Sequence, residues 1–313
     1  MINLRYHIVS LVAVFLALAL GIVMGSTVID QAIVDRLEER VNTVDARADR
    51  TANENRTLRG QLDLMNSFAG EARDQMVEGQ LRGVPVLVIT VQGIDRKPVE
   101  ALAAALTTSQ ALSAGTLQLT NKLRLENEGD IRALATTLNV NPSSTDVLRS
   151  QLVNRLGAVL DGASGDTTLI PALAANGFLG YEPPASTSVS TANLGLSSFP
   201  INGLRIVLVS GAGAQVADER LARPLVQAMT PPGTRSRVVV AESGQDTPGG
   251  RAVFVGPLRA DGSLSPRIST VDNLETPIGQ AAVVLAVDDL AQPLTGHYGV
   301  GPGAERLLPP VEP

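Results

Sequence analysis

The stretch GIVMGSTVIDQAIVDRLEERV, from Gly21 to Val41, joins two segments of opposite character without a linker. Its first five residues are apolar enough to lie in lipid, whereas its last ten alternate charges with Val and Leu at spacings of three and four. This pattern indicates a helix that leaves an apolar segment and continues as a charged rod. The expected architecture extends from this junction in both directions.

On the amino-terminal side, residues 8–29 carry no charge. As a helix they span roughly 33 Å, enough to cross a hydrocarbon core of about 30 Å. We therefore expect a short cytoplasmic tail at residues 1–7, a transmembrane anchor at residues 8–29 in the plasma membrane, and an extracytoplasmic remainder. The alternative is a cleaved signal peptide, although the apolar run is longer than the usual signal core. Counting Lys and Arg does not decide the orientation.

Small residues repeat at four-residue intervals within the anchor: Ala13, Ala17, Gly21 and Gly25. They form one stripe on a helix, and Gly21 to Gly25 is a GxxxG match, which is typical of closely packed membrane helices. The alternative is that small residues are simply common in such helices.

On the carboxyl-terminal side, apolar positions recur at spacings of 3 and 4 over more than four heptads. This period of 3.5 indicates a coiled coil, expected at residues 30–78. The predicted interface alternates a and d positions: Val34, Leu37, Val41, Val44, Ala48, Thr51, Asn55, Leu58, Leu62 and Met65.

The charges beside this seam favour two parallel helices. In a parallel pair, Arg40 faces Asp45 and Glu54 faces Arg59 of the partner, and a single Asn at an a position fixes the register. The middle of the seam buries little area, so either a homodimer or a hetero-coiled-coil with another protein fits. The remaining alternative is a lone helix folded back on the rest of the chain.

The rest of the chain has the pattern of an α/β domain at residues 79–300, Rossmann-like and with a mostly parallel sheet. PVLVITV, at Pro85–Val91, is typical of a strand buried on both faces. Residues 182–203 are rich in Pro, Ser, Thr and Gly and could divide two lobes, and residues 301–313 are expected to be flexible. Further strands are expected at Thr116–Thr120, Leu204–Ser210, Arg237–Ala241, Ala252–Val255 and Ala281–Val287, and helices at Pro98–Ala111, Gly129–Leu138, Asp146–Leu160 and Gln215–Met229.

Two places in this domain could carry chemistry. Gly211-Ala212-Gly213 follows a predicted strand, as in a phosphate-binding turn, but Val216 replaces the third Gly, so a plain tight turn is the simpler interpretation. Acidic residues and one histidine gather near the end: Asp272, Glu275, Asp288, Asp289 and His297. They could form a metal or acid–base site at the end of a sheet, or cap helices and pair with Arg. A small ligand or glycan near Gly211 or Asp288 is a third, weaker hypothesis.

Composition excludes several classes of protein. The net charge is −6, which argues against nucleic-acid binding. The chain has no Cys, 2 His and 5 Met, so disulfides and thiolate sites are excluded and soft metal ligands are scarce. No motif of a hydrolase, a P-loop or a zinc protease occurs. The sequence therefore predicts a non-enzymatic protein without a cofactor.

Two segments carry a resemblance to a known family: INLRYHIVSLVAVFLALALGIVMGS at the start, and ISTVDNLETPIGQAAVVLAVDDLAQPLTGHYGVGPGA near the end. They resemble the actinobacterial copper transporter MctB family, whose corynebacterial members are similar to the cell-separation protein SteB. The likeness covers nearly the whole chain.

That resemblance implies two different functions. The SteB-like branch implies control of cell separation, through a second membrane protein and a secreted peptidoglycan hydrolase, and the predicted coiled coil makes this the preferred hypothesis. The family name implies copper efflux or tolerance, with bound copper expected from the resemblance alone. No ligand residue is implied by either branch.

Overall fold

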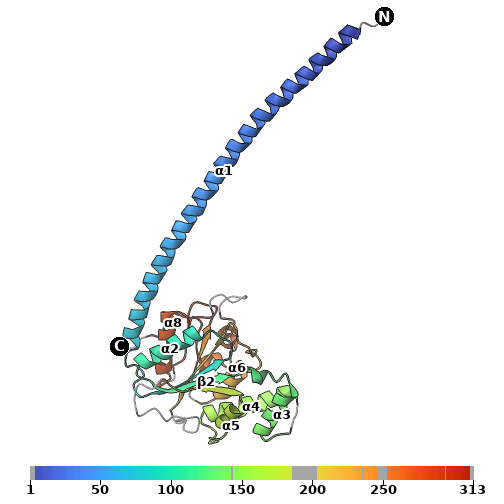
Figure 1. Cartoon of the computed structure of the whole chain (residues 1–313). Coiled ribbons are helices and arrows are strands. Elements are labelled where there is room, and N and C mark those ends of the chain that lie inside the picture. The colour runs from blue at the N-terminus through green and yellow to red at the C-terminus, as the bar shows by residue number, and fades with distance from the viewer. Residues whose placement is uncertain are drawn as a thin grey trace. The chain divides into compact units, whose positions relative to one another are not determined.

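The computed structural model describes residues 4–141, 144–184, 203–234, 236–244, 252–292 and 294–310, without the side chains of residues 4 and 26–32. The chain divides into two units, residues 1–65 and 66–313. The first unit consists of most of helix α1, Leu4–Val77, and the last turns of α1 belong to the second unit (Figure 1). The predicted lobe divider lies almost wholly outside the described residues.

The second unit is an α/β domain, as predicted. Its described residues form one seven-stranded sheet in the order β3-β2-β1-β4-β5-β6-β7, in which β3 alone runs antiparallel to its neighbour. The strands are β1 Pro85–Val91, β2 Leu112–Leu119, β3 Leu179–Glu182, β4 Arg205–Gly211, β5 Val238–Ser243, β6 Ser269–Val271 and β7 His297–Tyr298. The parallel strands have a doubly wound order that reverses between β1 and β4.

Helices cover both faces of the sheet, because the central strands are apolar on both sides. In β4, Ile206 and Leu208 belong to one core cluster, while Val207 and Val209 belong to the other. Helices α2 and α8 cover the second face, and α4 and α6 pack together on the first (Figure 1). The helices are α2 Arg96–Thr108, α3 Glu128–Thr137, α4 Thr145–Leu160, α5 Leu169–Ala175, α6 Ala222–Met229, α7 Val255–Ala260 and α8 Pro277–Asp289, with short 3-10 turns at Asn121–Arg124 and Ser265–Arg267.

The strand predicted at Ala281–Val287 is wrong, since these residues lie in α8. Every residue from Gly279 to Val287 is buried, so the helix is apolar all round and lacks the amphipathic period that identifies most helices. The start signal was present in the sequence: the hydroxyl of Thr276 accepts the Gly279 N–H at 3.0 Å, and Pro277 occupies the first turn.

The strand predicted at Ala252–Val255 is also wrong. Ala252 has a positive φ of 61°, and helix α7 starts at Val255. The pattern of a short apolar run does not by itself distinguish a strand from a buried helix. Here the N–H groups that a strand would pair with a neighbour bond instead to one buried carboxylate, that of Glu242.

Other elements differ in extent. The helix predicted at Gln215–Met229 begins only at Ala222, and the patterns do not predict β3, β6 or β7. The segment expected to be flexible, residues 301–313, has bonds to β7 and the residue after it: Gly299 donates to the Arg306 carbonyl at 3.0 Å, and Glu305 donates to that of His297 at 2.8 Å.

Candidate functional site

The predicted coiled-coil seam lies exposed along α1. Its larger apolar side chains range from 52% exposed at Val34 to 69% at Met65. The smaller seam residues Ala48, Thr51 and Asn55 are exposed as well, and the Asn55 amide donates to the Thr51 carbonyl at 2.9 Å. A coiled coil needs a second helix, so the pairing itself stays a prediction. The chain nevertheless presents the whole stripe on one regular helix.

The anchor is the one segment in the described residues that is long and apolar enough to cross a membrane, Arg5–Gly25. Of its small-residue stripe, Ala13, Ala17 and Gly21 are exposed. A Cβ added at Gly21 or Gly25 would meet no other atom of this chain within 4 Å. The fold of the chain therefore does not require these glycines, and their packing against another membrane helix stays a prediction.

The Gly211-Ala212-Gly213 turn does not have the features of a phosphate site. The Ala212 N–H donates to Ser243 at 3.1 Å, and the Ala214 N–H donates back to Gly211 at 3.2 Å. No helix begins at this turn, because α6 starts at Ala222. Two of its amides are therefore already satisfied, and the simpler interpretation, a tight turn, is the one the geometry favours.

The crevice at the switch between β1 and β4 is closed by the loops that follow these strands. The Gln215 N–H donates to the Gln92 carbonyl at 2.8 Å. Gly93 and Gly213 have φ angles of 102° and 86°, and a Cβ on either would overlap the carbonyl oxygen of the other. Doubly wound proteins often bind ligands in this crevice, but here backbone fills it.

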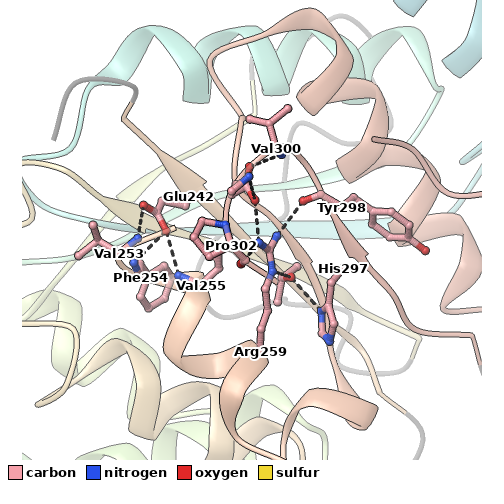
Figure 2. A network of polar contacts seen from close by, with 12 residues as sticks. Glu242, Val253, Phe254, Val255, Arg259, His297, Tyr298, Val300 and Pro302 are labelled. Carbon is pink, nitrogen blue, oxygen red and sulfur yellow. Dashed lines mark hydrogen bonds and ion pairs between the residues drawn. The ribbon is translucent and has the colours of Figure 1, made fainter. Parts of the chain in front are cut away.

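The acidic residues near the end of the chain do not form one site. Because Ala281–Val287 is helical, Asp288 and Asp289 lie at the carboxyl end of α8 and not at the end of a strand. Asp288 pairs loosely with Arg205 at 3.9 Å. Asp272, by contrast, follows β6 directly and lies in a buried network with His297 (Figure 2).

An ion pair between Arg259 and Asp272 forms the centre of that network. Their closest N and O atoms are 2.7 Å apart, and the two side chains are 3% and 0% exposed. Asp272 also accepts the N–H groups of Val300 and Gly301, at 2.8 and 3.0 Å. Gly299 has a φ of 127°, and a Cβ there would overlap the Asp272 carboxylate. The segments Val271–Asn273 and Gly299–Gly301, both in the carboxyl-terminal stretch that carries the family resemblance, are thus held together by these contacts.

The other nitrogens of Arg259 also have hydrogen-bond partners. Its Nε donates to the Thr270 hydroxyl at 2.8 Å, and its two other nitrogens reach the carbonyls of Tyr298 and Pro302 at 2.8 and 3.0 Å (Figure 2). Buried ion pairs of this kind need such additional bonds to offset desolvation. The pair is therefore a structural clamp between α7, β6 and the segment after β7.

His297 lies between two hydroxyl groups. Its Nε2 lies 2.6 Å from the Ser265 hydroxyl and its Nδ1 lies 3.0 Å from the Thr270 hydroxyl. Thr270 also accepts from the Nε of Arg259, so the ring is connected to the Arg259 network through this hydroxyl. Burial and the Arg259 charge lower the pKa of His297, which keeps it neutral.

Glu242 is a buried carboxylate with a structural role that the sequence patterns miss. It is 1% exposed and accepts the N–H groups of Val253, Phe254 and Val255 at 2.8–2.9 Å, where α7 begins (Figure 2). Burial raises the pKa of its carboxyl group, and these three bonds lower it. The sequence signal for this carboxylate is a Glu within an apolar strand, VVVAES, because a buried acid needs hydrogen-bond partners.

Copper ligands are not gathered in the part of the chain that the structure describes. No group of three or more His, Cys, Asp or Glu side chains there could hold a metal ion. Met24 and Met65 are exposed on α1, roughly 60 Å apart along the helix. Met76 and Met229 pack in different core clusters. The thioether donors that Cu(I) prefers thus form no cluster in the part of the chain that the structure describes.

Comparison with known proteins gives one consistent result. The family model described as "Copper transport outer membrane protein, MctB" matches residues 1–309. A protein named "Copper transporter MctB" from Mycobacterium tuberculosis (strain ATCC 25618 / H37Rv) is 27% identical over 326 residues, which cover 97% of this chain and 98% of the relative. One of the same name from Mycobacterium leprae (strain TN) is 26% identical over 329 residues, covering 99% and 100%. The similarity thus extends over the anchor, α1 and the α/β unit.

Proposed function

The chain belongs to the MctB family, and from this premise we propose that it is a membrane-anchored envelope protein that serves copper export or copper tolerance. The family is one of copper transport proteins and not of enzymes. The family match thus favours copper transport over the cell-separation role that the coiled-coil pattern suggested. We further propose that the protein acts without catalysis, with its anchor in the plasma membrane and its α/β domain outside the cytoplasm.

The observation that carries this proposal is the exposed seam of α1, which continues directly from the apolar anchor. A single membrane span cannot line a pore, so transport through this protein requires several chains or a partner. The seam supplies a surface for such an assembly, since burying each Val or Leu contributes about 1.5–3 kcal/mol. Copper is then the cargo of the assembly and not a ligand of one α/β domain.

A second candidate function rests on the same surface. The middle of the seam, at Ala48, Thr51 and Asn55, offers little apolar area to an identical helix. A helix of a second membrane protein or of a secreted cell-wall hydrolase could fill it better. In that case the protein would regulate cell separation, and copper would be unaffected.

The test is a deletion strain complemented with variants of the full-length protein. Val41→Asp with Leu58→Asp places two charges in the seam. The matched control, Ala46→Asp with Asn53→Asp, adds the same charge on the opposite side of the same helix. The measurements are cellular copper by mass spectrometry, growth in copper, and septum separation by microscopy.

We expect the deletion to raise cellular copper, the wild type and the control to restore it, and the seam variant to fail. Normal copper in the deletion strain would refute the copper function. Full restoration by the seam variant would refute the role of the seam. Cells that remain joined while their copper stays normal would establish the second candidate instead.

A further inference from the structure

The last turns of α1, residues 66–77, form the foot of this helix and belong to the α/β unit. Along the chain, the foot joins the exposed seam to that unit. Val77 is 0% exposed and belongs to the core cluster that α2 and α8 share, and Met76 packs against the same cluster. Leu81, just past the helix, is buried in that cluster as well. The foot is therefore held by the core of the α/β unit.

The turn after the foot is bonded to the end of α2. The Gly79 N–H donates to the Thr108 carbonyl at 3.3 Å. The Leu81 N–H donates to the Ser109 carbonyl at 2.9 Å. Gly79 has a φ of 70°, the left-handed conformation in which helices commonly end. The chain therefore leaves the foot in a bonded turn and not in a free linker.

A series of hydrogen bonds connects the foot to the loop between β6 and α8. Arg73 is 16% exposed, and its Nη1 donates to the Oε1 of Gln280, near the start of α8. Gln280 is 3% exposed, and its Nε2 donates to the Leu274 carbonyl at 3.2 Å. The Leu274 N–H donates to the Glu242 carbonyl at 3.3 Å, near the end of β5. Because a buried amide with both ends bonded has few alternative positions, Gln280 fixes Arg73 to this loop.

We propose that the foot is a fixed joint, through which an assembly of α1 acts on α8 and on the loop between β6 and α8. No Pro interrupts α1, so the commonest cause of a kink is missing. Gly70 is the weakest helix former in the foot and the place where a hinge would be expected. The contacts of Arg73 and Val77 follow this glycine and hold the helix against the core. Only the action on α8 rests on the proposed function, because it requires assembly through the seam.

The experiment measures one distance by electron paramagnetic resonance on the full chain in lipid nanodiscs. Because the chain has no Cys, spin labels attach only at introduced sites. Asn66→Cys places one label before the glycine of the foot, and Thr136→Cys places the other on the exposed surface of α3. Dilution with unlabelled protein removes distances between copies. Arg73→Met keeps the apolar stem and removes the donors, and Arg50→Met, on the exposed part of α1, is the matched control.

We expect one narrow distance distribution in the wild type and in Arg50→Met. In Arg73→Met it should become about twice as wide, because the local contacts that restrain the foot are lost. Arg73→Lys, which keeps a donor for Gln280, should restore most of the narrow distribution. A broad distribution in the wild type, or an unchanged width in Arg73→Met, would overturn the proposal. A denaturant titration checks that Arg73→Met folds, and if it does not, the wild-type width decides alone.

A second measurement tests the action on α8, by cellular copper in the deletion strain. Arg50→Met should restore normal copper, and Arg73→Met should not, although its seam is unchanged. Full restoration by Arg73→Met despite a widened distribution would refute the action through the joint. Normal copper in the deletion strain would refute the proposed function, while the distance distribution would still test the joint. The two failures are therefore distinguishable.

Discussion

The seam of α1 and the Arg259 network break the usual rules of burial in opposite directions. On α1, Leu and Val side chains at heptad spacing stay more than half exposed. In the α/β unit, the charges of Arg259 and Asp272 are nearly inaccessible to water. Apolar residues outside and charges inside are both costly, so each region requires compensation.

The compensation comes from different places. Each N–H-bearing nitrogen of Arg259 has a bonded oxygen within the same chain, and Asp272 has three donors. The seam residues have no such cover in the part of α1 that the structure describes. The Arg259 network therefore finds its partners within the chain, while the pairing of the seam with a second molecule stays a prediction. Stability should depend on the network, and assembly should depend on the seam.

The largest expected effect is the loss of Asp272. Asp272→Ala leaves the Arg259 charge buried without its partner, which typically costs about 3–5 kcal/mol. We expect the free energy of unfolding of the α/β unit, measured by denaturant titration of the full chain, to fall by that amount.

The matched control is Asp288→Ala. Asp288 is half-exposed, and its pairing with Arg205 is long at 3.9 Å, so its loss should cost less than about 1 kcal/mol. Equal effects of the two substitutions would show that burial of the Arg259 pair does not set its contribution.

The next effect concerns assembly and leaves the α/β unit intact. Val41→Asp with Leu58→Asp should weaken self-association or partner capture about a hundredfold, near 3 kcal/mol, because two apolar contacts per chain become buried charges. Crosslinking in membranes measures this. The unfolding of the α/β unit should not change, and a changed unfolding midpoint would contradict the division between the two regions.

The predicted parallel orientation of that assembly depends on Asn55. In a parallel pair of identical helices, Asn55 faces Asn55 of the second copy and the two amides can bond to each other. In an antiparallel pair with all ten seam positions matched, Asn55 would face Val44 and lose that bond. Asn55→Val should therefore relax the orientation, which crosslinks between engineered cysteines can detect.

The fold class was predictable because it depends on long apolar runs. Pro85–Val91 and Arg205–Gly211 are buried on both faces, and their composition alone indicates a parallel sheet. The segment around Val283 and Val284 is equally rich in apolar residues but lies in α8, in a stretch of the helix that is buried on all sides. Only the helix-start signal at Thr276-Pro277 distinguishes this helix from a buried strand, and the run of apolar residues led to the wrong prediction of a strand.

The polar sites were less predictable, because tertiary contacts create them. Asp272 and His297 were selected from the sequence, yet their central partner is Arg259, which no spacing rule links to either. The cleft between α2 and the β3 edge of the sheet was not predicted at all. It forms because β3, a strand the patterns missed, pairs with β2 and leaves one face of that edge beside α2. Local pattern identifies elements, and only their assembly identifies sites.

A smaller effect should come from Asp218, a partly buried acid that has a neutral partner. Its carboxylate accepts the Ser210 hydroxyl at 2.5 Å, and burial raises its pKa to about 6. The native state thus holds the proton more tightly than the unfolded state, so the ionised group destabilises the fold above about pH 4 and most strongly above pH 6. Asp218→Asn should raise the free energy of unfolding at pH 7 by about 1–2 kcal/mol after allowance for solvent screening.

That gain should shrink as the pH falls from 7 and approach zero only below about pH 3, where Asp218 is protonated in both states. A gain of the same size at pH 3 and pH 7 would show that the substitution acts through packing and not through charge.

The smallest effect has the opposite sign and separates the network from the seam once more. The lowered pKa of His297 means that the unfolded state binds the proton more readily, so stability declines as the pH falls below about 6.5. The slope is less than about 1.4 kcal/mol per pH unit, the limit for one proton. A second proton on the ring would be poorly solvated and would add charge beside Arg259, and Glu305 would offset only part of this.

Because Asp218 titrates in the same range with the opposite sign, the measurement belongs in the Asp218→Asn background. There, His297→Asn keeps a polar side chain beside Thr270 and removes the titration. Its free energy of unfolding should vary less between pH 7.5 and pH 5 than that of the parent. Self-association through α1 should not change with His297→Asn, because the histidine belongs to the unit whose partners are all internal. Parallel pH curves for parent and variant would mean that the network holds the histidine equally well in either protonation state, and that Arg259 alone accounts for the clamp.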